Sequence, residues 1–361
     1  MFILLILSAG AYLGFVLFIL SGLFRHNEHS ISSTEDTPFV SVVIAARNED
    51  KNLPNLIQDL VNQEYPIDKL EIIIVDDRST DLTPNILLEA SQNYAFIKSI
   101  RIDEKSTEMT PKKNALSLGI QSAKGVVIVS TDADCRVGNL WVASMAYRVE
   151  QDNAIAIGFS KVDGDSFFDQ YQQVDFLGII AANAGAGGWD QFWSGTGQNL
   201  AYKKSDFEAI GGFEQVKNKP SGDDMFLVQA ISTLRTGVIN IDTNSFVSTQ
   251  AVSTIQQFLN QRSRWSSNSR TNAEKSPLFF GFLTSAFLCN AFLLLSFLFS
   301  SPWFFVFSIK FILEALVIFL GGKLFDTRVN PFVYLAWSVI QPFYIPVVSL
   351  MGIQNRFSWK P

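Results

Sequence analysis

Thiols and imidazoles are scarce in this sequence of 361 residues, which contains only two cysteines and two histidines. Cys135 and Cys289 are too few for a disulfide framework, and they fit a reducing compartment. Basic residues are outnumbered, with 28 lysines and arginines against 34 acidic residues and a formal net charge of −6. A nucleic-acid-binding protein needs a basic footprint, so no nucleic-acid partner is expected. His26 and His29 share one polar stretch, where a solvated linker explains them more simply than a metal site.

Charge is absent from Phe2 to Phe24, an almost wholly apolar run that is followed by Arg25. A run of this length can cross a bilayer as a helix. A cleaved signal peptide is the alternative, but signal peptides normally begin with basic residues and have a shorter apolar core. Nothing basic precedes this run, so we expect a retained anchor over residues 1–24, with Arg25 facing the cytoplasm.

A polar linker is expected over residues 25–37, and strand-like and helix-like segments then alternate over residues 38–250. VSVVIAA, EIIIVDD and GVVIVSTD are rich in Val and Ile, which is typical of buried parallel strands. Helical stretches are expected between them, over residues 53–62, 83–92 and 111–123. This alternation predicts a doubly wound α/β sheet, with ligands at the carboxyl ends of its strands.

The last part of the sequence is again apolar. Residues 251–277 place apolar side chains at helical spacing among basic and aromatic ones, which is typical of a helix at a membrane surface. Within residues 278–361, three apolar blocks are each long enough to span a bilayer: Leu278–Ser300, Pro302–Gly321 and Pro331–Gly352.

Two features of these apolar blocks leave alternatives open. Lys310 and Glu314 lie four residues apart in the second block, so they can pair with each other or contact a polar headgroup or acceptor. One anchor and three spans would leave a basic tail outside the cytoplasm, against the usual charge bias. Either the last block, interrupted by Pro342 and Pro346, is re-entrant, or the bias fails here.

Asp132 and Asp134 follow the strand-like run VVIVS. We expect an extended segment there, in which residues two apart point the same way and both carboxylates face one ion. Carboxylate oxygens suit Mg²⁺ or Mn²⁺, which share their coordination with substrate phosphates and neutralise charge on a departing diphosphate. A solvated acidic turn is the alternative.

Asp76 and Asp77 end the second strand-like run, where their carboxylates can accept hydrogen bonds from a nucleotide base or ribose. The alternative is a capped turn that involves Thr80 or Asp81 before the next helix. Lys112, in TPKKNAL, is placed either to reach a phosphate or to be solvated in the first turn of a helix.

Asp223 and Asp224 follow Gly222 and precede a helical stretch. Neighbouring carboxylates disfavour joint ionisation, which raises the pKa of one of them. A raised pKa suits a general base that must deprotonate a sugar or lipid hydroxyl. Capping of the helix by either aspartate is the alternative interpretation.

In QRSRW, Gln261, Arg264 and Trp265 share one face of a helix. Arginine offers a fork of donors for a diphosphate, and tryptophan offers a flat surface for a sugar ring. An interfacial helix with Trp265 at the level of the lipid headgroups is the alternative.

Four motifs follow one another along the chain: Asp76–Asp77, Asp132–Asp134, Asp223–Asp224 and QRSRW. In this order, they resemble the motifs of family 2 inverting glycosyltransferases with the GT-A fold. The resemblance is to the membrane-bound (Q/R)xxRW branch, which includes ceramide glucosyltransferases and processive polysaccharide synthases, and it covers Phe39 to Trp265. It implies an α/β GT-A domain over residues 38–250, with one N-terminal and about three C-terminal transmembrane helices. Two departures are Pro111, where the family usually has Gly, and Asp223, where it usually has Glu.

The resemblance also implies roles for individual residues. Nucleotide contacts are implied at Ala46, Glu49, Asp76, Asp77, Lys112 and Asp132. A metal site is implied at Asp134 with Asp132, a base at Asp224 beside Asp223, and diphosphate and acceptor contacts at Gln261, Arg262, Arg264 and Trp265.

Transfer of a sugar from a nucleotide diphosphate is the implied reaction, with Mg²⁺ or Mn²⁺ as cofactor and uridine diphosphate as the family's usual carrier. About four candidate spans give scant walls for a polymer channel, so we expect a membrane lipid or lipid-linked acceptor. A processive polysaccharide synthase subunit is the alternative, and a non-catalytic scaffold that binds nucleotide sugars is an alternative of another class. We expect an integral membrane protein with its catalytic domain in the cytoplasm, in a bacterial inner membrane.

Overall fold

The computed structural model describes residues 2–26, 37–151, 153–297 and 302–354, so the expected linker and C-terminal tail largely lie outside the described residues. The chain forms two compact units. The sheet unit comprises Asn27–Lys161 and Ser194–Gln250, and the helical unit comprises Met1–His26, Val162–Trp193 and Ala251–Pro361. The helical unit is therefore assembled from three separate stretches of sequence.

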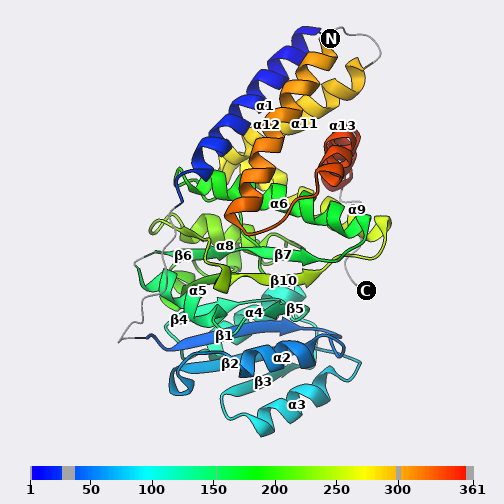
Figure 1. The fold of residues 1–361 in the computed structure, drawn as a ribbon. Coiled ribbons are helices and arrows are strands. Elements are labelled where there is room, and N and C mark those ends of the chain that lie inside the picture. Colours follow the sequence, from blue (N-terminus) through cyan, green and yellow to red (C-terminus); the bar gives the residue numbers. More distant parts are fainter. Residues whose placement is uncertain (1, 27–36, 152, 298–301, 355–361) are drawn as a thin grey trace. The chain divides into compact units, whose positions relative to one another are not determined.

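The sheet unit contains a seven-stranded sheet in the order β3-β2-β1-β4-β8-β6-β9 (Figure 1). Its strands are β1 Val40–Ala46, β2 Leu70–Asp77, β3 Ile97–Ile102, β4 Val127–Ser130, β6 Ile155–Gly158, β8 Leu200–Lys203 and β9 Val238–Asn240. A second sheet has the order β5-β10-β7, with β5 Cys135–Val137, β10 Val247–Gln250 and β7 Ser160–Asp163, which leads into the helical unit.

Strands β1, β2 and β4 confirm the three expected parallel strands. β1 pairs in parallel with β2 and with β4, and every residue of β2 is buried, as a continuous run of Val and Ile predicts. Strand β8 was not predicted: it lies between β4 and β6 and runs antiparallel to both. The sheet is therefore mixed rather than wholly parallel.

Helices cover both faces of this sheet. They are α2 Leu53–Val61, α3 Thr83–Asn93, α4 Pro111–Ser122, α5 Trp141–Glu150, α7 Lys204–Ala209 and α8 Asp223–Ile231, with 3₁₀ turns η1 Ile67–Lys69, η2 Glu214–Val216 and η3 Thr243–Ser245. The three expected helices are confirmed as α2, α3 and α4 to within one residue at each end. Helix α2 buries Leu53, Leu56 and Leu60, each worth about 1.5–3 kcal/mol.

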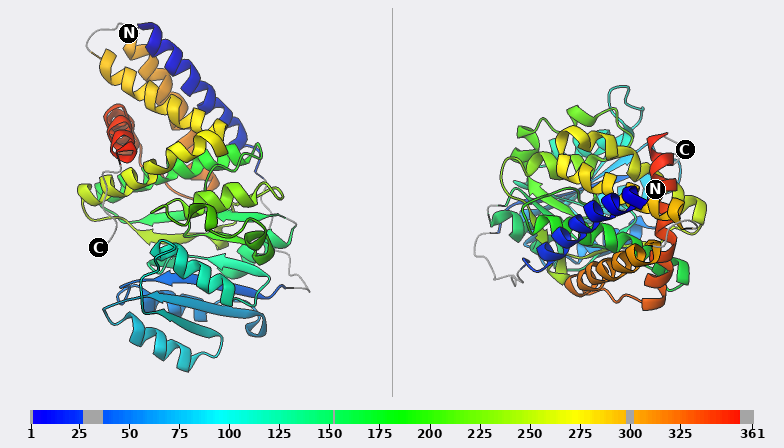
Figure 2. Two further views of the ribbon diagram at one scale, coloured as in Figure 1. Left: turned by 180° about the vertical axis from the view of Figure 1, so that it is seen from behind. Right: turned by 90° about the horizontal axis from the view of Figure 1, so that it is seen from above.

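The helical unit contains α1 Phe2–Leu23, α6 Phe167–Gly187, α9 Ile255–Ser266, η4 Ser267–Thr271, α10 Asn272–Lys275, α11 Pro277–Ser296, α12 Trp303–Leu324 and α13 Pro331–Ile353. By length and composition, α1, α11, α12 and α13 could each cross a membrane. Helices α1, α11 and α12 run together as a bundle in Figure 1 and in the left view of Figure 2. The expected apolar segments are thus helical.

Glycines bring α1 and α6 into direct backbone contact. A side-chain carbon placed on Gly22 would lie 1.8 Å from the carbonyl oxygen of Gly185. Only glycine allows the two helices to approach this closely, so either position excludes any larger residue.

Inside the bundle, the expected pairing of Lys310 with Glu314 is confirmed. The Lys310 ammonium donates to Oε2 of Glu314 at 2.8 Å, and the Tyr12 hydroxyl of α1 donates to Oε1 at 2.6 Å. Both charged side chains are buried. The carboxylate therefore neutralises the ammonium and joins α1 to α12.

Candidate active site

The predicted nucleotide residues collect at one edge of the large sheet. Ala46 ends β1 and pairs with Asp76 near the end of β2. On the other side of β1, Val43 pairs with Ser130, the last residue of β4, which lies two residues before Asp132. The carboxyl ends of these parallel strands meet where an open α/β sheet binds its ligands.

Asp76 and Asp77 are held by protein groups at this edge. Asp76 accepts a hydrogen bond from the Ser79 backbone N–H at 3.0 Å and pairs with Arg101. Asp77 accepts two hydrogen bonds from Arg78, at 2.8 and 3.1 Å. Asp81 does not occupy the N-cap of α3, which is Leu82, but its carboxylate accepts from the Thr83 N–H at 3.0 Å in the turn before that helix. Asp76 and Asp77 are thus oriented before any nucleotide binds.

The loop after β1 is fixed against the loop after β2. Asn48 adopts a positive φ of 54°, and its N–H donates to Ser79 Oγ at 2.9 Å. The N–H of Glu49 donates to Thr83 Oγ1 at 2.9 Å, and its buried carboxylate accepts from Asn52 at 2.8 Å. Glu49 therefore lies beside the same strand ends as Ala46.

Lys112 joins two of the predicted motifs. It lies in the first turn of α4, and its Nζ donates to Asp132 Oδ1 at 2.6 Å. Burial opposes the charged form of Lys112, but Asp132, Asp223 and Asp224 outweigh this effect and raise its pKa above the usual value. The lysine therefore stays charged next to three carboxylates. Pro111 is the first residue of α4, directly before Lys112.

Asp132 and Asp134 lie in a turn, so the expected extended segment is wrong. The Cys135 N–H donates to the Asp132 carbonyl oxygen at 3.2 Å, which closes the turn between β4 and β5. Both carboxylates are partly exposed. Among the described residues, no three His, Cys, Asp or Glu side chains converge on a metal ion. Two carboxylates fit Mg²⁺ or Mn²⁺ only if a substrate diphosphate completes the shell, which is the usual arrangement for Mg²⁺.

Asp223 and Asp224 begin α8, but neither caps it. The N-cap is Gly222, in the left-handed conformation, and it forms no side-chain cap. Asp224 Oδ1 accepts from the Met225 N–H at 2.7 Å, and Oδ2 accepts from the Gly197 N–H at 3.2 Å. Burial, followed by repulsion from Asp223, raises the pKa of Asp224 to about 6. A carboxyl group with this pKa can act as a base near neutral pH.

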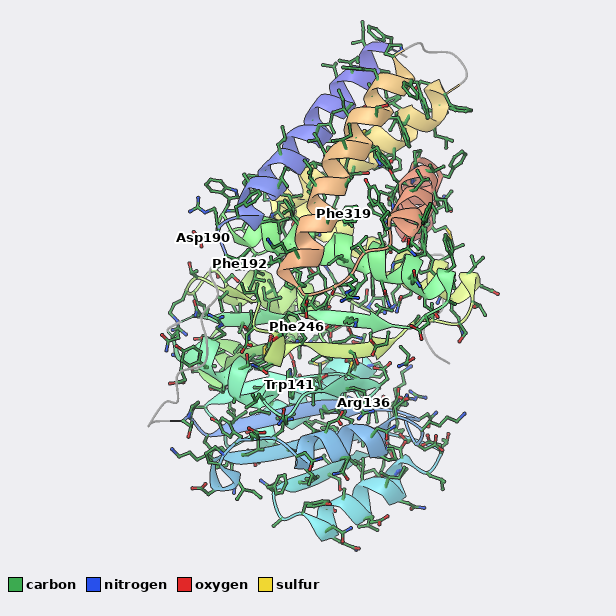
Figure 3. The ribbon with its side chains drawn as sticks, viewed as in Figure 1. Arg136, Trp141, Asp190, Phe192, Phe246 and Phe319 are labelled. Atoms are coloured by element: carbon green, nitrogen blue, oxygen red, sulfur yellow. The ribbon has the colours of Figure 1, made fainter. Side chains whose placement is uncertain are left out.

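The loop that carries Gly197 is anchored by Asn199. Asn199 Nδ2 donates to the carbonyl oxygens of Phe159 and Ser245, at 2.8 and 2.7 Å, and Oδ1 accepts from Trp141 Nε1 at 3.0 Å. Trp141, which is fully buried, is labelled in Figure 3. The segment GTGQN thus presents a backbone N–H to Asp224.

Lys113 is a residue that sequence reasoning missed. Its side chain is 1% exposed, and its Nζ donates to the Lys219 carbonyl oxygen at 2.7 Å and lies 3.9 Å from Asp223 Oδ1. The Thr110 N–H also donates to the Lys217 carbonyl oxygen, at 2.9 Å. The start of α4 therefore holds the segment that leads to Asp224. Lys112 and Lys113 are consecutive in the first turn of a helix, so their side chains point in different directions. This pattern was the available signal that Lys113 has a different partner from Lys112.

QRSRW belongs to the helical unit, on α9. Arg262 is buried, with its Nε 2.7 Å from Asp175 Oδ2 and its guanidinium 4.3 Å from the Trp265 ring centre. It also donates to Gln261 Oε1. Arg264 lies partly exposed on the same helix. The ion pair with Asp175 was not predicted, because nothing local in the sequence links the two residues.

Comparison with known proteins agrees with this architecture. Residues 41–216 match the family model described as glycosyl transferase family 2. A β-monoglucosyldiacylglycerol synthase of Nostoc sp. is 36% identical over 115 residues, which cover 32% of this chain and 24% of that protein. The Bacillus subtilis protein described as "Probable glycosyltransferase YdaM" is 30% identical over 211 residues, which cover 55% of this chain and 50% of that protein. The chain therefore spans half or less of the length of these relatives.

A solved structure supports the fold. The mannosyltransferase PcManGT of Pyrobaculum calidifontis, in complex with GDP-Man and Mn²⁺, superposes with a TM-score of 0.66. The match covers 98% of this chain and 99% of that chain at 17% sequence identity, so it shows the GT-A fold alone. Residues 41–216 are thus a glycosyl transferase family 2 segment, in a chain that has the GT-A fold.

Proposed function

We propose that this protein is a membrane-bound inverting glycosyltransferase of the (Q/R)xxRW branch. It would move a sugar from a nucleoside diphosphate, with a UDP-sugar as the expected donor, to the hydroxyl of a membrane lipid or lipid-linked acceptor. The observation that carries the proposal is that the Lys112 ammonium donates to Asp132 and also interacts electrostatically with Asp223 and Asp224. Lys112 therefore links Asp132, in the expected metal and diphosphate site, to Asp224, a carboxyl group with a raised pKa.

The reaction is a single displacement. Asp224 takes the proton of the acceptor hydroxyl, and the hydroxyl oxygen forms a bond to the anomeric carbon of the sugar. The bond from that carbon to the diphosphate oxygen breaks, and the diphosphate carries the electron pair away. One inversion turns an α-linked donor into a β-linked product.

Lys112, Asp132 and Asp134 would stabilise the leaving diphosphate. Lys112 provides a fixed ammonium, and Asp132 and Asp134 would hold Mg²⁺ or Mn²⁺ together with the diphosphate. The bound ion supplies a Lewis acid that neutralises developing charge. Asp76, Asp77, Glu49 and Ala46 line the strand ends that would receive the nucleotide.

The composition of the helical unit and the names of the relatives both support a lipid acceptor. Four helices are long and apolar enough to cross a membrane, which suggests an integral membrane protein. Relatives described as β-monoglucosyldiacylglycerol synthases use a lipid, by their name. We keep the family assignment of Gln261, Arg262, Arg264 and Trp265 to the diphosphate and acceptor, with Arg262 also holding α9 through Asp175. The catalytic domain would face the cytoplasm.

The test is sugar transfer by membranes that contain the full chain, with Mg²⁺ or Mn²⁺ and a panel of radiolabelled UDP- and GDP-sugars. Asp224→Asn should abolish transfer and leave donor binding intact. Asp68→Asn, at an exposed position in η1, is the matched control and should keep full activity.

The outcomes separate the candidate functions. Label in the organic extract supports a lipid acceptor and names the donor. Label in a high-mass aqueous fraction would make the protein a polysaccharide synthase. Donor binding without turnover in the unaltered chain would favour a scaffold, and an active Asp224→Asn variant would exclude Asp224 as the base.

A further inference from the structure

Helix α13 starts against α6. Its N-cap, Asn330, accepts a hydrogen bond from the Phe332 N–H at 3.0 Å. The same side chain donates through Nδ2 to Gln170 Oε1 of α6, also at 3.0 Å. The N-cap of α13 is therefore hydrogen-bonded to the first turn of α6, which begins at Phe167.

The middle of α13 contacts both α6 and α9, which together are called the α6–α9 layer. Trp337 Nε1 donates to Asp175 Oδ1 of α6 at 3.2 Å. One residue on α6 thus holds both this tryptophan and Arg262 of α9, whose Nε lies 2.7 Å from Asp175 Oδ2. Two turns later, the Tyr344 ring stacks on Phe258 of α9 with centres 5.7 Å apart. All of these side chains belong to the helical unit.

The last turns of α13 lie against the end of α9. A side-chain carbon placed on Gly352 would be 2.8 Å from the Ser263 carbonyl oxygen and 2.8 Å from Ser266 Cβ. Contact with the α6–α9 layer therefore continues from Asn330 to Gly352, over the whole helix.

The length of α13 distinguishes a spanning helix from one that lies along the α6–α9 layer. A helix of 23 residues is about 35 Å long, so a spanning α13 that begins at α6 would end about 30 Å away from that layer. Helices α1 and α12 behave in this way, since they meet α6 in their last turns, at Gly22 against Gly185 and at Gly321 against Ala181. In Figure 1, α13 is seen nearly along its axis while α1, α11 and α12 run lengthwise, and the right view of Figure 2 shows its length.

The two faces of α13 differ in the way that an interfacial helix requires. Its protein-facing side carries Trp337, Ser338 and Gln341, which are buried. Its outer side carries large apolar residues that are 48–78% exposed: Phe332, Leu335, Val339, Phe343, Val347 and Leu350. Successive members are three or four residues apart, so they form one stripe along the helix.

From this geometry we propose that α13 lies along the membrane surface instead of crossing it, with its outer apolar stripe docked on the acyl chains of one leaflet. The occupant is lipid because α13 shares the layer of α6 and α9 at the ends of the apolar bundle. Both ends of α13 then lie on the same side of the membrane as QRSRW. Of the two alternatives that the sequence left open, this favours a last block that does not cross.

Cysteine labelling tests the proposal on the full chain. Arg328→Cys and Gln354→Cys place single exposed thiols before and after α13, and the two native cysteines are buried, so the unaltered chain is the blank. A membrane-impermeant maleimide is applied to sealed vesicles of each orientation. We expect both positions to react from the same face, and reaction from opposite faces would overturn the proposal.

Helix α12 provides the matched control. Phe304→Cys and Lys323→Cys lie in the first and last turns of a helix that should cross, and they should react from opposite faces, with Lys323→Cys on the face shared by both α13 positions. The assay needs no turnover, so its result is independent of the proposed sugar transfer.

Depth measurement gives a second readout. Nitroxide labels at Leu335→Cys and Leu350→Cys sit 15 residues apart, or about 22 Å along the axis. A helix lying in the surface gives both labels nearly the same depth by electron paramagnetic resonance. A depth difference near 20 Å would also overturn the proposal.

Discussion

Replacing Asp224 with asparagine should make the stability of the sheet unit less dependent on pH. In the folded chain, burial and the Asp223 carboxylate raise the pKa of Asp224 from 3.8 to about 6. The folded state therefore holds this proton more tightly than the unfolded state, so ionisation of Asp224 destabilises the fold. The cost is absent below about pH 4 and is complete above about pH 6 to 7.

The size of the effect follows from the pKa. A rise from 3.8 to about 6 corresponds to about 3 kcal/mol of free energy of unfolding. Asp224 is partly exposed, so solvent screening lowers the expected value to about 1–2 kcal/mol. Asparagine has only one acceptor oxygen for the N–H groups of Gly197 and Met225, which costs about 1 kcal/mol. A protonated aspartate has a similar limitation, and the pKa of about 6 already includes both hydrogen bonds to the ionised form, so this loss adds no further pH dependence.

The assay is thermal or chemical unfolding of the purified chain in detergent, at pH 4.5 and at pH 7.5. The stability of the variant relative to the unaltered chain should rise by about 1 kcal/mol between the two pH values, because the carboxyl group of the unfolded chain is already mostly ionised at pH 4.5. For a unit of this size that is a relative gain in Tm of about 2–4 °C. Asp224→Ala should give the same pH-dependent difference with a larger constant loss. A relative stability that is flat with pH, or that falls as pH rises, would refute a raised pKa at Asp224.

Three further changes test other contacts. Lys113→Met should lower kcat by about 10- to 100-fold with little change in donor KM, since hydrogen bonds to a charged group are worth about 1.5–3 kcal/mol. Lys113→Arg should recover part of the lost kcat. Lys204→Met, which removes another lysine that donates to a backbone carbonyl, is its control, and equal losses would mean a general effect. Asp175→Leu should cost about 3–5 kcal/mol of stability and a second change, Arg262→Met, should restore most of it, as unfolding in detergent will show. Chelation of divalent cations should abolish transfer and Mn²⁺ should restore it, whereas undiminished transfer would contradict the metal assignment.

The local parts of the fold could be predicted because their signals are local. Runs of Val and Ile gave β1, β2 and β4, and the motifs at their ends fall at one sheet edge as the parallel arrangement requires. Capping of α8 by its aspartates was a fair local alternative, but the left-handed Gly222 occupies the cap. At Asp132 the sequence left an acidic turn open beside an extended segment, and the structure has the turn, because the alternation of a strand does not continue beyond the end of β4.

Long-range contacts could not be predicted from the sequence alone. Lys113 and the Lys219 carbonyl group are 106 residues apart, and Arg262 and Asp175 are 87 residues apart. Such pairs depend on how the chain crosses the sheet, including the insertion of antiparallel β8 between β4 and β6. Sequence patterns describe one element at a time, so they identify charged candidates without pairing them.

The interleaving of the two units has a consequence for biosynthesis. The sheet unit is complete once Gln250 has been made, whereas the helical unit needs residues 251–361. At about 5–20 residues per second, ribosomes take on the order of ten seconds for that remainder. During this interval, the Tyr12 hydroxyl of α1 lacks its Glu314 acceptor. The sheet unit can therefore fold before the helical unit is complete, and a stall late in translation would leave it joined to α1 and α6 without the helices that follow Gln250.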